Sequence, residues 1–488
     1  MNVFDYFFEN TKNLEKEFIS GLSETISFKE LHLRCLKLAN TLESQGIFNE
    51  NIILISDNSV FFTTVYLGII KSGNTCVPLN PNIEDYNFKD ILQATEAKHC
   101  FANAKIRSKF EEYPISIHTE KETTEWISNQ YEKPRNHSEV PFDENRLAEI
   151  IYTSGSTGKQ KGAMITHKNI ITNSESIITY LKLTGSDRMQ VVLPFYYCYG
   201  LSLLHTHLRV GGSLVFNNSF VFLGSVINTL NKYQCTGFAG VPSHFQILLR
   251  KSKEFTTQSF PTLRYVTQAG GRLHNAFIEE FTAAFPDIDF YVMYGQTEAT
   301  ARLSYLEPGK LKDKLGSIGM GIPGVELRVI NEKGHWVKPG ETGEIVAKGD
   351  NIMLGYYKDI ESTQETIKNG WLFTGDLATI DEDGYIFVKG RKKEIFKIRG
   401  FRVSPKEIED TLLRYPGVID CSVKAVSDEI TGESMIAIIY VDESNLENFS
   451  EEKIKQYCAG YLSPYKIPDK IIFETKLTYK ESGKKAII

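Results

Sequence analysis

Apolar residues follow two alternating patterns along the N-terminal two thirds of the chain. Short runs such as Asn51–Ile55 and Thr75–Leu79 are almost continuously apolar, as expected for strands that are buried on both faces. Longer segments such as Leu31–Leu42 and Val60–Ser72 carry apolar residues at helical spacing. Strands that alternate with helices predict mostly parallel sheets covered on both sides. The pattern continues at Met189–Leu193, Gly200–Arg209, Ser213–Phe216, Gly224–Lys232, Gly237–Val241, Ser243–Lys251 and Leu263–Gln268.

The pattern changes near residue 320. Short alternating strands separated by glycine and proline fill Ile322–Val388, which predicts a small, largely antiparallel subdomain. The last part of the chain combines helices and strands in a unit of domain-like size, with elements expected at Pro405–Leu413, Val418–Val426, Met435–Val441, Glu452–Tyr461 and Lys470–Glu474. We therefore predict an α/β fold: a large N-terminal domain (1–392) with two mostly parallel sheets flanked by helices and a small β-rich subdomain, then a small mobile α+β domain (393–488).

Composition narrows the functional class. The 488 residues are 41% hydrophobic and 24% charged, and the net charge of −6 is spread without long like-charge blocks. This gives no electrostatic reason to expect nucleic acid or an anionic membrane as a partner. The apolar runs are far shorter than the ~18–20 residues that span a bilayer. The seven cysteines are scattered without a Cys-x-x-Cys pair, which indicates small buried side chains rather than a disulfide framework or a zinc site. With no secretory signal pattern at the N-terminus, we expect a soluble cytoplasmic protein.

The segment 152–162 (YTSGSTGKQKG) is the strongest candidate for chemistry. Apolar residues on both sides predict two strands joined by a glycine-rich loop. Hydroxyls, lysines and closely spaced backbone N–H groups suit a polyphosphate. A Walker-type loop is excluded by spacing, because Lys159 is followed by Gln160 instead of a hydroxyl residue. A flexible linker is the remaining alternative, although linkers are not normally set between two β-branched apolar runs.

This loop resembles the phosphate loop of the adenylate-forming superfamily, which includes acyl- and aryl-CoA synthetases, luciferases and peptide-synthetase adenylation domains. Further segments in the same order extend the resemblance over nearly the whole chain. It implies nucleotide contacts from the loop at Thr153, Ser154, Gly155, Ser156, Thr157, Gly158, Lys159 and Lys161.

The segment Leu193–Gly200 (LPFYYCYG) ends a predicted strand and opens a helix. In related enzymes this segment lines the acid pocket, which implies pocket positions at Tyr196, Tyr197, Tyr199 and Gly200, with tyrosine at 196 or 197 in place of the usual histidine. No acidic residue occurs in 189–209, so an α-amino acid substrate is disfavoured. His205 and His207 lie two residues apart, do not share a helix face and are treated as structural.

Two glycine-containing segments, Gln268–Arg272 (QAGGR) and Tyr294–Glu298 (YGQTE), each follow a predicted strand. The glycines of the first allow close backbone approach to a flat ring. By resemblance, the Thr297 hydroxyl contacts the α-phosphate, and Glu298 holds Mg²⁺. Magnesium prefers carboxylate and phosphate oxygens, and Thr153 is a second candidate ligand. The nucleotide-site residues implied here are Gly270, Gly271, Tyr294, Gly295 and Thr297, and the acid-pocket residues are Gln268 and Gln296.

The remaining segments follow in family order. Asp376, expected directly after a tight turn, is suited to accept both ribose hydroxyls. In Gly390–Phe401 (GRKKEIFKIRGF), the resemblance assigns Arg391 to the ribose, Lys393 to the hinge, and Gly400 to the thiol tunnel. Two lysines then take catalytic roles by resemblance: Lys397 in the second half-reaction, and Lys484 as the bridge between carboxylate and phosphate during adenylation.

The resemblance implies an acid–thiol ligase. ATP and Mg²⁺ would convert a small-molecule carboxylic acid to an acyl-adenylate and pyrophosphate, and a thiol, most readily that of CoA, would then displace AMP. The phosphopantetheine of an acyl carrier protein is the alternative acceptor, because both thiols present the same arm. A non-catalytic nucleotide-binding protein is a remote alternative. The residues leave the acid open among aryl, hydroxylated and medium-chain acyl classes.

Overall fold

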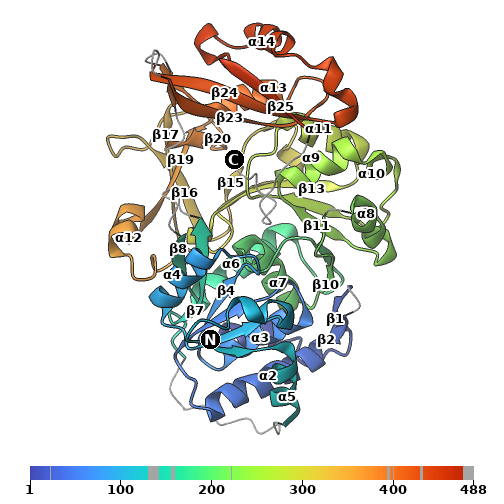
Figure 1. Ribbon diagram of the computed structural model, residues 1–488, viewed down its shortest axis with the longest axis vertical. Helices are drawn as coiled ribbons and strands as arrows, with labels where there is room; N and C mark the ends of the chain where they lie inside the picture. The colour runs from blue at the N-terminus through green and yellow to red at the C-terminus, as the bar shows by residue number, and fades with distance from the viewer. Residues whose placement is uncertain are drawn as a thin grey trace.

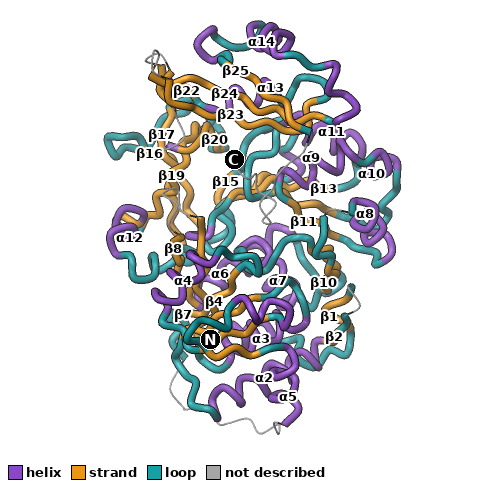
Figure 2. The backbone as a smooth tube through the Cα atoms, in the orientation of Figure 1, coloured by secondary structure: helices purple, strands orange, loops and turns teal. Residues whose placement is uncertain are grey.

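The computed structural model describes residues 1–21, 24–129, 142–154, 160–220, 222–392, 396–398, 401–428 and 432–475. Two large sheets with helices between and around them form the N-terminal region, and a β-rich subdomain and a C-terminal unit adjoin the first sheet (Figure 1). Figure 2 shows the same chain coloured by secondary structure. No helix of the described residues is long and apolar enough to cross a membrane.

The first sheet has nine strands in the order β15-β14-β13-β12-β11-β9-β10-β1-β2. The six strands from β13 to β1 are parallel. β2 pairs antiparallel with β1 at one edge, and β14 and β15 extend the other side of the sheet through antiparallel pairs. Buried side chains alternate between its faces, so that Tyr265 and Val266 enter different cores. The strands are β1 (Glu17–Ser20), β2 (Ile26–Ser27), β9 (Arg188–Val191), β10 (Ser213–Phe216), β11 (Gly237–Gly240), β12 (Tyr265–Gln268), β13 (Asp289–Tyr294), β14 (Ser304–Leu306) and β15 (Met320–Gly321).

The second sheet has six strands in the order β6-β5-β3-β4-β7-β8. All pairs are parallel except the hairpin of β7 and β8, in which Thr153 lies opposite Lys161. The predicted pair of strands around the glycine-rich loop is therefore confirmed. The strands are β3 (Asn51–Ile55), β4 (Thr75–Leu79), β5 (His99–Ala102), β6 (Ser116–His118), β7 (Leu147–Ser154) and β8 (Gln160–Thr166).

Helices cover both sheets. A central apolar core joins the two sheets through α1 (Val3–Phe8), α3 (Val60–Lys71), α6 (His167–Leu181) and α7 (Cys198–Val210). The outer face of the first sheet is covered by α8 (Leu223–Lys232), α9 (Pro242–Lys251), α10 (Lys253–Thr257) and α11 (Asn275–Ala284). The α4 helix (Asp85–Thr95) packs on the outer face of the second sheet. The α2 helix (Phe28–Ser44) packs against α3 and against α5 (Glu120–Asn129).

Local sequence accounts for where these helices begin and end. At the start of α6, Thr166 and Asn169 form a reciprocal capping box. The α7 helix ends at Gly211, whose φ of 75° is the left-handed conformation that favours glycine. Short 3₁₀ helices lie at η1 (Ala104–Lys109), η2 (Thr297–Ala299), η3 (Pro308–Lys310), η5 (Glu443–Asn448) and η6 (Pro464–Lys466).

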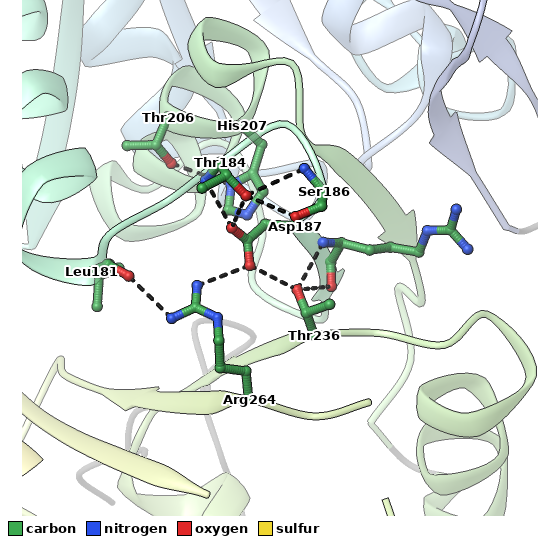
Figure 3. Close-up of polar contacts among 9 residues, drawn as sticks. Leu181, Thr184, Ser186, Asp187, Thr206, His207, Thr236 and Arg264 are labelled. Carbon is green, nitrogen blue, oxygen red and sulfur yellow. Dashed lines mark hydrogen bonds and ion pairs between the residues drawn. The ribbon is translucent and has the colours of Figure 1, made fainter. Parts of the chain in front are cut away.

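The amino ends of β9, β11 and β12 are joined through hydrogen bonds to the Asp187 side chain (Figure 3). Its carboxylate accepts hydrogen bonds from Arg264 (2.9 Å) and Thr236 (2.9 Å), and from the backbone N–H of Thr184 (2.8 Å). Burial opposes ionisation of Asp187, but these donors outweigh it and lower the pKa of the carboxyl. This edge is therefore closed by polar contacts, and the carboxyl ends of the strands lie at the opposite edge.

The β-rich subdomain contains β16 (Val325–Ile330), β17 (Thr342–Gly349), β18 (Ile367–Lys368), β19 (Trp371–Ile380), β20 (Ile386–Arg391) and α12 (Ile360–Thr366). All of its strand pairs are antiparallel. Two small apolar clusters, around Ala347 and Ile345, form its core.

The C-terminal unit contains the hairpin β21 (Phe396–Ile398) and β22 (Phe401–Val403), a three-stranded sheet of β23 (Val418–Asp428), β24 (Gly432–Val441) and β25 (Lys470–Glu474), and helices α13 (Pro405–Leu412) and α14 (Glu451–Ala459). Its apolar core is continuous with that of α9 and α11. An ion pair of 2.5 Å joins Arg272 to Asp410 of α13. The predicted fold class is confirmed, whereas the mobility of this unit stays a prediction.

Candidate active site

The carboxyl ends of β9, β12 and β13 meet at one edge of the first sheet, because the three strands are parallel. The segments that sequence reasoning singled out follow these strands: Leu193–Gly200, Gln268–Arg272 and Tyr294–Glu298. One of the contacts between them is direct, since Cys198 Sγ lies 3.5 Å from Thr297 Oγ1. The sheet topology therefore brings the predicted acid-binding and phosphate-binding segments together.

The turn that carries Thr297 and Glu298 depends on glycine. A Cβ atom at Gly295 would lie 1.9 Å from the carbonyl oxygen of Ala301, so no other residue fits without movement of the backbone. Asn351 supports the turn by donating to the carbonyls of Ala299 (3.3 Å) and Arg302 (2.8 Å). Thr297 and Glu298 therefore lie on a backbone that is held by the close approach at Gly295 and by the hydrogen bonds from Asn351.

Glu298 is held by a residue that the sequence did not identify. The hydroxyl of Tyr356 donates to Glu298 Oε1 at 2.7 Å, and the backbone N–H of Met353 donates to the Glu298 carbonyl at 3.0 Å. Burial, and next the charge of Glu298, raise the pKa of Tyr356, so its hydroxyl keeps its proton. The only local signal was a short Leu-Gly-Tyr-Tyr run between a strand and a helix, which gives no indication of a partner so distant in sequence.

The aromatic segment Leu193–Gly200 leads into α7, and the backbone of Gly200 lies close to that of Pro194. A Cβ atom at Gly200 would lie 2.1 Å from the Pro194 carbonyl oxygen, which fixes glycine at this predicted pocket position. The rings of Tyr196 and Tyr197 lie 4.7 Å apart. Cys198, the partly exposed first residue of α7, was not predicted as a site residue although it contacts Thr297.

Two predicted pocket side chains are hydrogen-bonded to the backbone of β12 and of the turn that follows it. The Tyr199 hydroxyl donates to the Thr267 carbonyl at 2.9 Å, and the guanidinium of Arg302 stacks 4.1 Å from the centre of the Tyr199 ring. The Gln268 amide donates to the Gly271 carbonyl at 2.7 Å. Tyr199 and Gln268 are both buried. Their polar groups are therefore bound to the backbone at the carboxyl end of β12 and in the Gly270–Gly271 turn.

Asp376 lies within β19, which corrects the expectation that it follows a tight turn. The register shifts between β17 and β19 near this position, and Gly375 adopts a φ of 76°, so the carboxylate projects from a bulged strand. Asp376 Oδ2 accepts a hydrogen bond from the Tyr294 hydroxyl at 2.7 Å, and Oδ1 accepts one from Arg391 Nε at 3.2 Å. Three residues predicted to contact the nucleotide are thus adjacent, although they lie far apart in the sequence.

The β7–β8 hairpin carries the predicted phosphate loop and is called the phosphate hairpin below. It is described up to Ser154 and again from residue 160, so that Thr153 is included. The Lys161 ammonium donates to Ser362 Oγ at 2.5 Å and lies 5.1 Å from the centre of the Tyr356 ring. The predicted loop residues Gly155, Ser156, Thr157, Gly158 and Lys159 lie outside the described residues, as do Lys393, Gly400 and Lys484. Lys397 lies opposite Arg402 in the β21–β22 hairpin.

The donor set fits magnesium. Among the described residues, no group of three or more His, Cys, Asp or Glu side chains could hold a metal by itself. Mg²⁺ is commonly held by one or two carboxylates together with substrate phosphates. Glu298 would supply one carboxylate beside Thr297, and the remaining oxygens around the ion would come from the nucleotide and water. This arrangement suits a metal that arrives with its nucleotide.

Comparison with known proteins agrees with this geometry. The family model of the AMP-binding enzyme matches residues 8–357, and that of the AMP-binding enzyme C-terminal domain matches residues 407–484. The chain is 28% identical over 485 residues to 4-coumarate–CoA ligase-like 6 of Arabidopsis thaliana, covering 96% of this chain and 85% of that protein.

Two solved structures extend the likeness. ATP-bound MatB from Rhodopseudomonas palustris is 27% identical, with a TM-score of 0.89 over 99% of this chain and 97% of that chain. The fold is also that of o-succinylbenzoate coenzyme A synthetase (MenE) from Bacillus subtilis in complex with ATP and magnesium ion, at 23% identity and a TM-score of 0.85 over 99% of this chain and 98% of that one. This chain therefore belongs to the AMP-binding enzyme family and is an AMP-forming acid–thiol ligase.

Proposed function

We propose that this enzyme activates an aryl or short-to-medium acyl carboxylic acid with ATP and transfers the acyl group from the adenylate to CoA. The observation that carries the proposal is the contact between Cys198, at the start of the predicted acid-binding helix, and Thr297 in the predicted phosphate turn. A carboxylate placed at this junction would lie between an aromatic segment and the groups suited to the α-phosphate. The name of the relative from Arabidopsis, a 4-coumarate–CoA ligase-like protein, supports an organic acid and CoA as substrates.

The residues at the site would act mainly through position and charge. Thr297 would donate a hydrogen bond to the α-phosphate, and Glu298 would hold Mg²⁺, which neutralises phosphate charge when it is bound. Asp376, kept in place by Tyr294 and Arg391, would accept hydrogen bonds from the ribose hydroxyls. No general base is needed in adenylation, because the attacking carboxylate is already ionised at neutral pH. Holding it in line with the α-phosphate is therefore the main catalytic task.

Two features favour a small acid without a positive charge. Tyr199 fills the space between α7 and β12, where its hydroxyl is held by the Thr267 carbonyl and its ring by Arg302. A long acyl chain directed toward β12 would have to displace this buried side chain. The absence of Asp and Glu from 189–209 leaves a substrate ammonium group without a partner in the acid-binding segment.

ATP–pyrophosphate exchange over a panel of acids tests this proposal. We expect exchange with benzoic, hydroxycinnamic, hexanoic or octanoic acid to exceed exchange with palmitic acid and with phenylalanine by at least about tenfold, corresponding to about 1.4 kcal/mol. Preferred exchange with palmitic acid would contradict the small-acid proposal. Absence of exchange with every acid would contradict adenylation itself.

The acceptor is tested separately. Thioester formation is measured with free CoA and with a phosphopantetheinylated carrier protein at equal concentrations, and we expect CoA to be the better acceptor. Faster transfer to the carrier protein would favour the alternative.

We further propose that Lys484 serves adenylation and Lys397 serves thioester formation. Lys484→Ala should then lose exchange but convert supplied acyl-adenylate, whereas Lys397→Ala should keep exchange; the opposite result would reject these roles.

A further inference from the structure

The segment Met353–Tyr357 connects three parts of the candidate site. Its backbone runs antiparallel to β8: the N–H of Leu354 donates to the Met164 carbonyl (3.0 Å), and the N–H of Tyr357 donates to the Gly162 carbonyl (2.7 Å). At its start, the N–H of Met353 donates to the Glu298 carbonyl (3.0 Å). The 353–357 segment thus joins the phosphate hairpin to the turn that carries the proposed metal ligand.

The Tyr356 side chain is fixed independently of Glu298. Its backbone N–H donates to Thr363 Oγ1 of α12 at 2.8 Å, and the side chain is mostly buried beneath the Lys161 ammonium. The neighbouring Gly355 has a φ of 143°, and a Cβ atom there would lie 2.5 Å from Thr363 Cγ2. Glycine at 355 therefore allows α12 to pack closely enough to hold the tyrosine backbone in place.

We propose that Tyr356 is a positioning residue that orients the Glu298 carboxylate for the Mg²⁺ of bound ATP. The proposal rests on the function proposed above. The Tyr356 hydroxyl donates a hydrogen bond to Glu298 Oε1 at 2.7 Å. This bond occupies Oε1 and fixes the rotation of the carboxylate. Oε2 would then be left to bind the metal, with the carboxylate held in one orientation. Without the hydroxyl, the carboxylate can rotate among several orientations, and ordering it would weaken metal binding.

We expect loss of the Tyr356 hydroxyl to weaken the affinity for the metal more than the affinity for the nucleotide. Groups that hydrogen-bond to a metal-ligating side chain commonly change metal affinity by about 10-fold to 100-fold when removed. Tyr356→Phe deletes only the hydroxyl and keeps the ring beneath Lys161. A purely structural role for Tyr356 would lower stability and nucleotide binding together, without a specific dependence on the metal concentration.

The test measures binding of Mn²⁺, a spectroscopic substitute for Mg²⁺, by electron paramagnetic resonance in the presence of α,β-methylene-ATP. Full-length wild type and Tyr356→Phe are compared at fixed nucleotide concentration. Tyr357→Phe is the matched control, because the hydroxyl of the adjacent Tyr357 is paired with the Asn51 side chain, from which it accepts a hydrogen bond. We expect Tyr356→Phe to raise the half-saturating Mn²⁺ concentration at least about 10-fold, and Tyr357→Phe to leave it within twofold of wild type.

The variant Glu298→Gln decides whether Tyr356 acts through the carboxylate. If it does, Tyr356→Phe combined with Glu298→Gln should bind Mn²⁺ no more weakly than Glu298→Gln alone, because the two changes remove one interaction. Additive losses would overturn the proposal, as would wild-type Mn²⁺ binding by Tyr356→Phe or an equal loss in Tyr357→Phe. Failure of the wild-type protein to bind Mn²⁺ with the nucleotide would instead overturn the proposed function on which the inference depends.

Discussion

A buried carboxyl group in the central core predicts how stability depends on pH. Glu149 of β7 is 1% exposed and lies between the two sheets. Its Oε2 accepts a hydrogen bond from the Tyr66 hydroxyl at 2.7 Å, and the Tyr66 oxygen lies 2.8 Å from His205 Nε2. No cation pairs with Glu149 among the residues that the structure describes. Cys76 is its neighbour on β4, and burial raises the pKa of that thiol, so it remains neutral.

Burial determines the protonation state of this group. It raises the pKa of Glu149 to about 7 from an ordinary value of 4.5, and it lowers the pKa of His205 to about 3. Both side chains are therefore uncharged in the folded protein at mildly acidic pH. Below pH 4.5 the carboxyl is protonated in the folded and the unfolded chain alike. Between pH 4.5 and 7 only the unfolded chain loses the proton, so the contribution of Glu149 to stability falls as the pH rises.

The magnitude follows from the two pKa values. One pKa unit corresponds to about 1.36 kcal/mol. Above pH 7, the loss of unfolding free energy caused by the raised pKa of Glu149 therefore approaches about 3 kcal/mol. Glu149→Gln removes the titration but adds an amide whose N–H groups need partners, at a cost of about 1–3 kcal/mol that does not depend on pH. The pH-dependent part of the difference should therefore be about 2–3 kcal/mol between pH 5 and pH 8.

Urea denaturation at constant ionic strength measures this difference. Relative to wild type, Glu149→Gln should gain stability steadily as the pH rises from 5 to 8. Glu279→Gln, which neutralises an exposed carboxylate on α11, is the control and should show no comparable gain. A constant stability difference between Glu149→Gln and wild type across this range would refute the reasoning.

Two further variants and one labelling experiment probe the site and its surroundings. Gly295→Ala would place a methyl group 1.9 Å from the Ala301 carbonyl, so calorimetry should show destabilisation of about 1–3 kcal/mol, and exchange activity should fall with it; wild-type stability would contradict this. Cys198 is the one cysteine of the seven that is not buried, so mass spectrometry after brief iodoacetamide treatment should find it labelled first; equal labelling of all seven would be evidence against the fold. Arg272→Ala removes the partner of Asp410 and should destabilise the docked C-terminal unit by about 1 kcal/mol, seen as faster limited proteolysis near residues 390–400; unchanged cleavage would exclude such a role.

The sequence alone determined the elements with strong local signals. The β3, β10 and β25 strands match their predicted bounds, because short, mostly apolar runs between turn residues are typical of buried strands. The order of the chemical segments also predicted the family and placed Thr297 and Glu298 after a strand. These features depend on neighbouring residues, which a single chain displays directly.

Tertiary structure alone decided which distant residues meet. Asp376 was expected after a turn, but the register of β19 against β17 places it in a bulged strand beside Tyr294. The bond from Tyr356 to Glu298 depends on a segment that runs along β8. The contact of Glu149 with Tyr66 likewise depends on how α3 packs against the second sheet. Periodicity records which face of an element is buried, but long-range pairing depends on strand register and on close packing throughout the core.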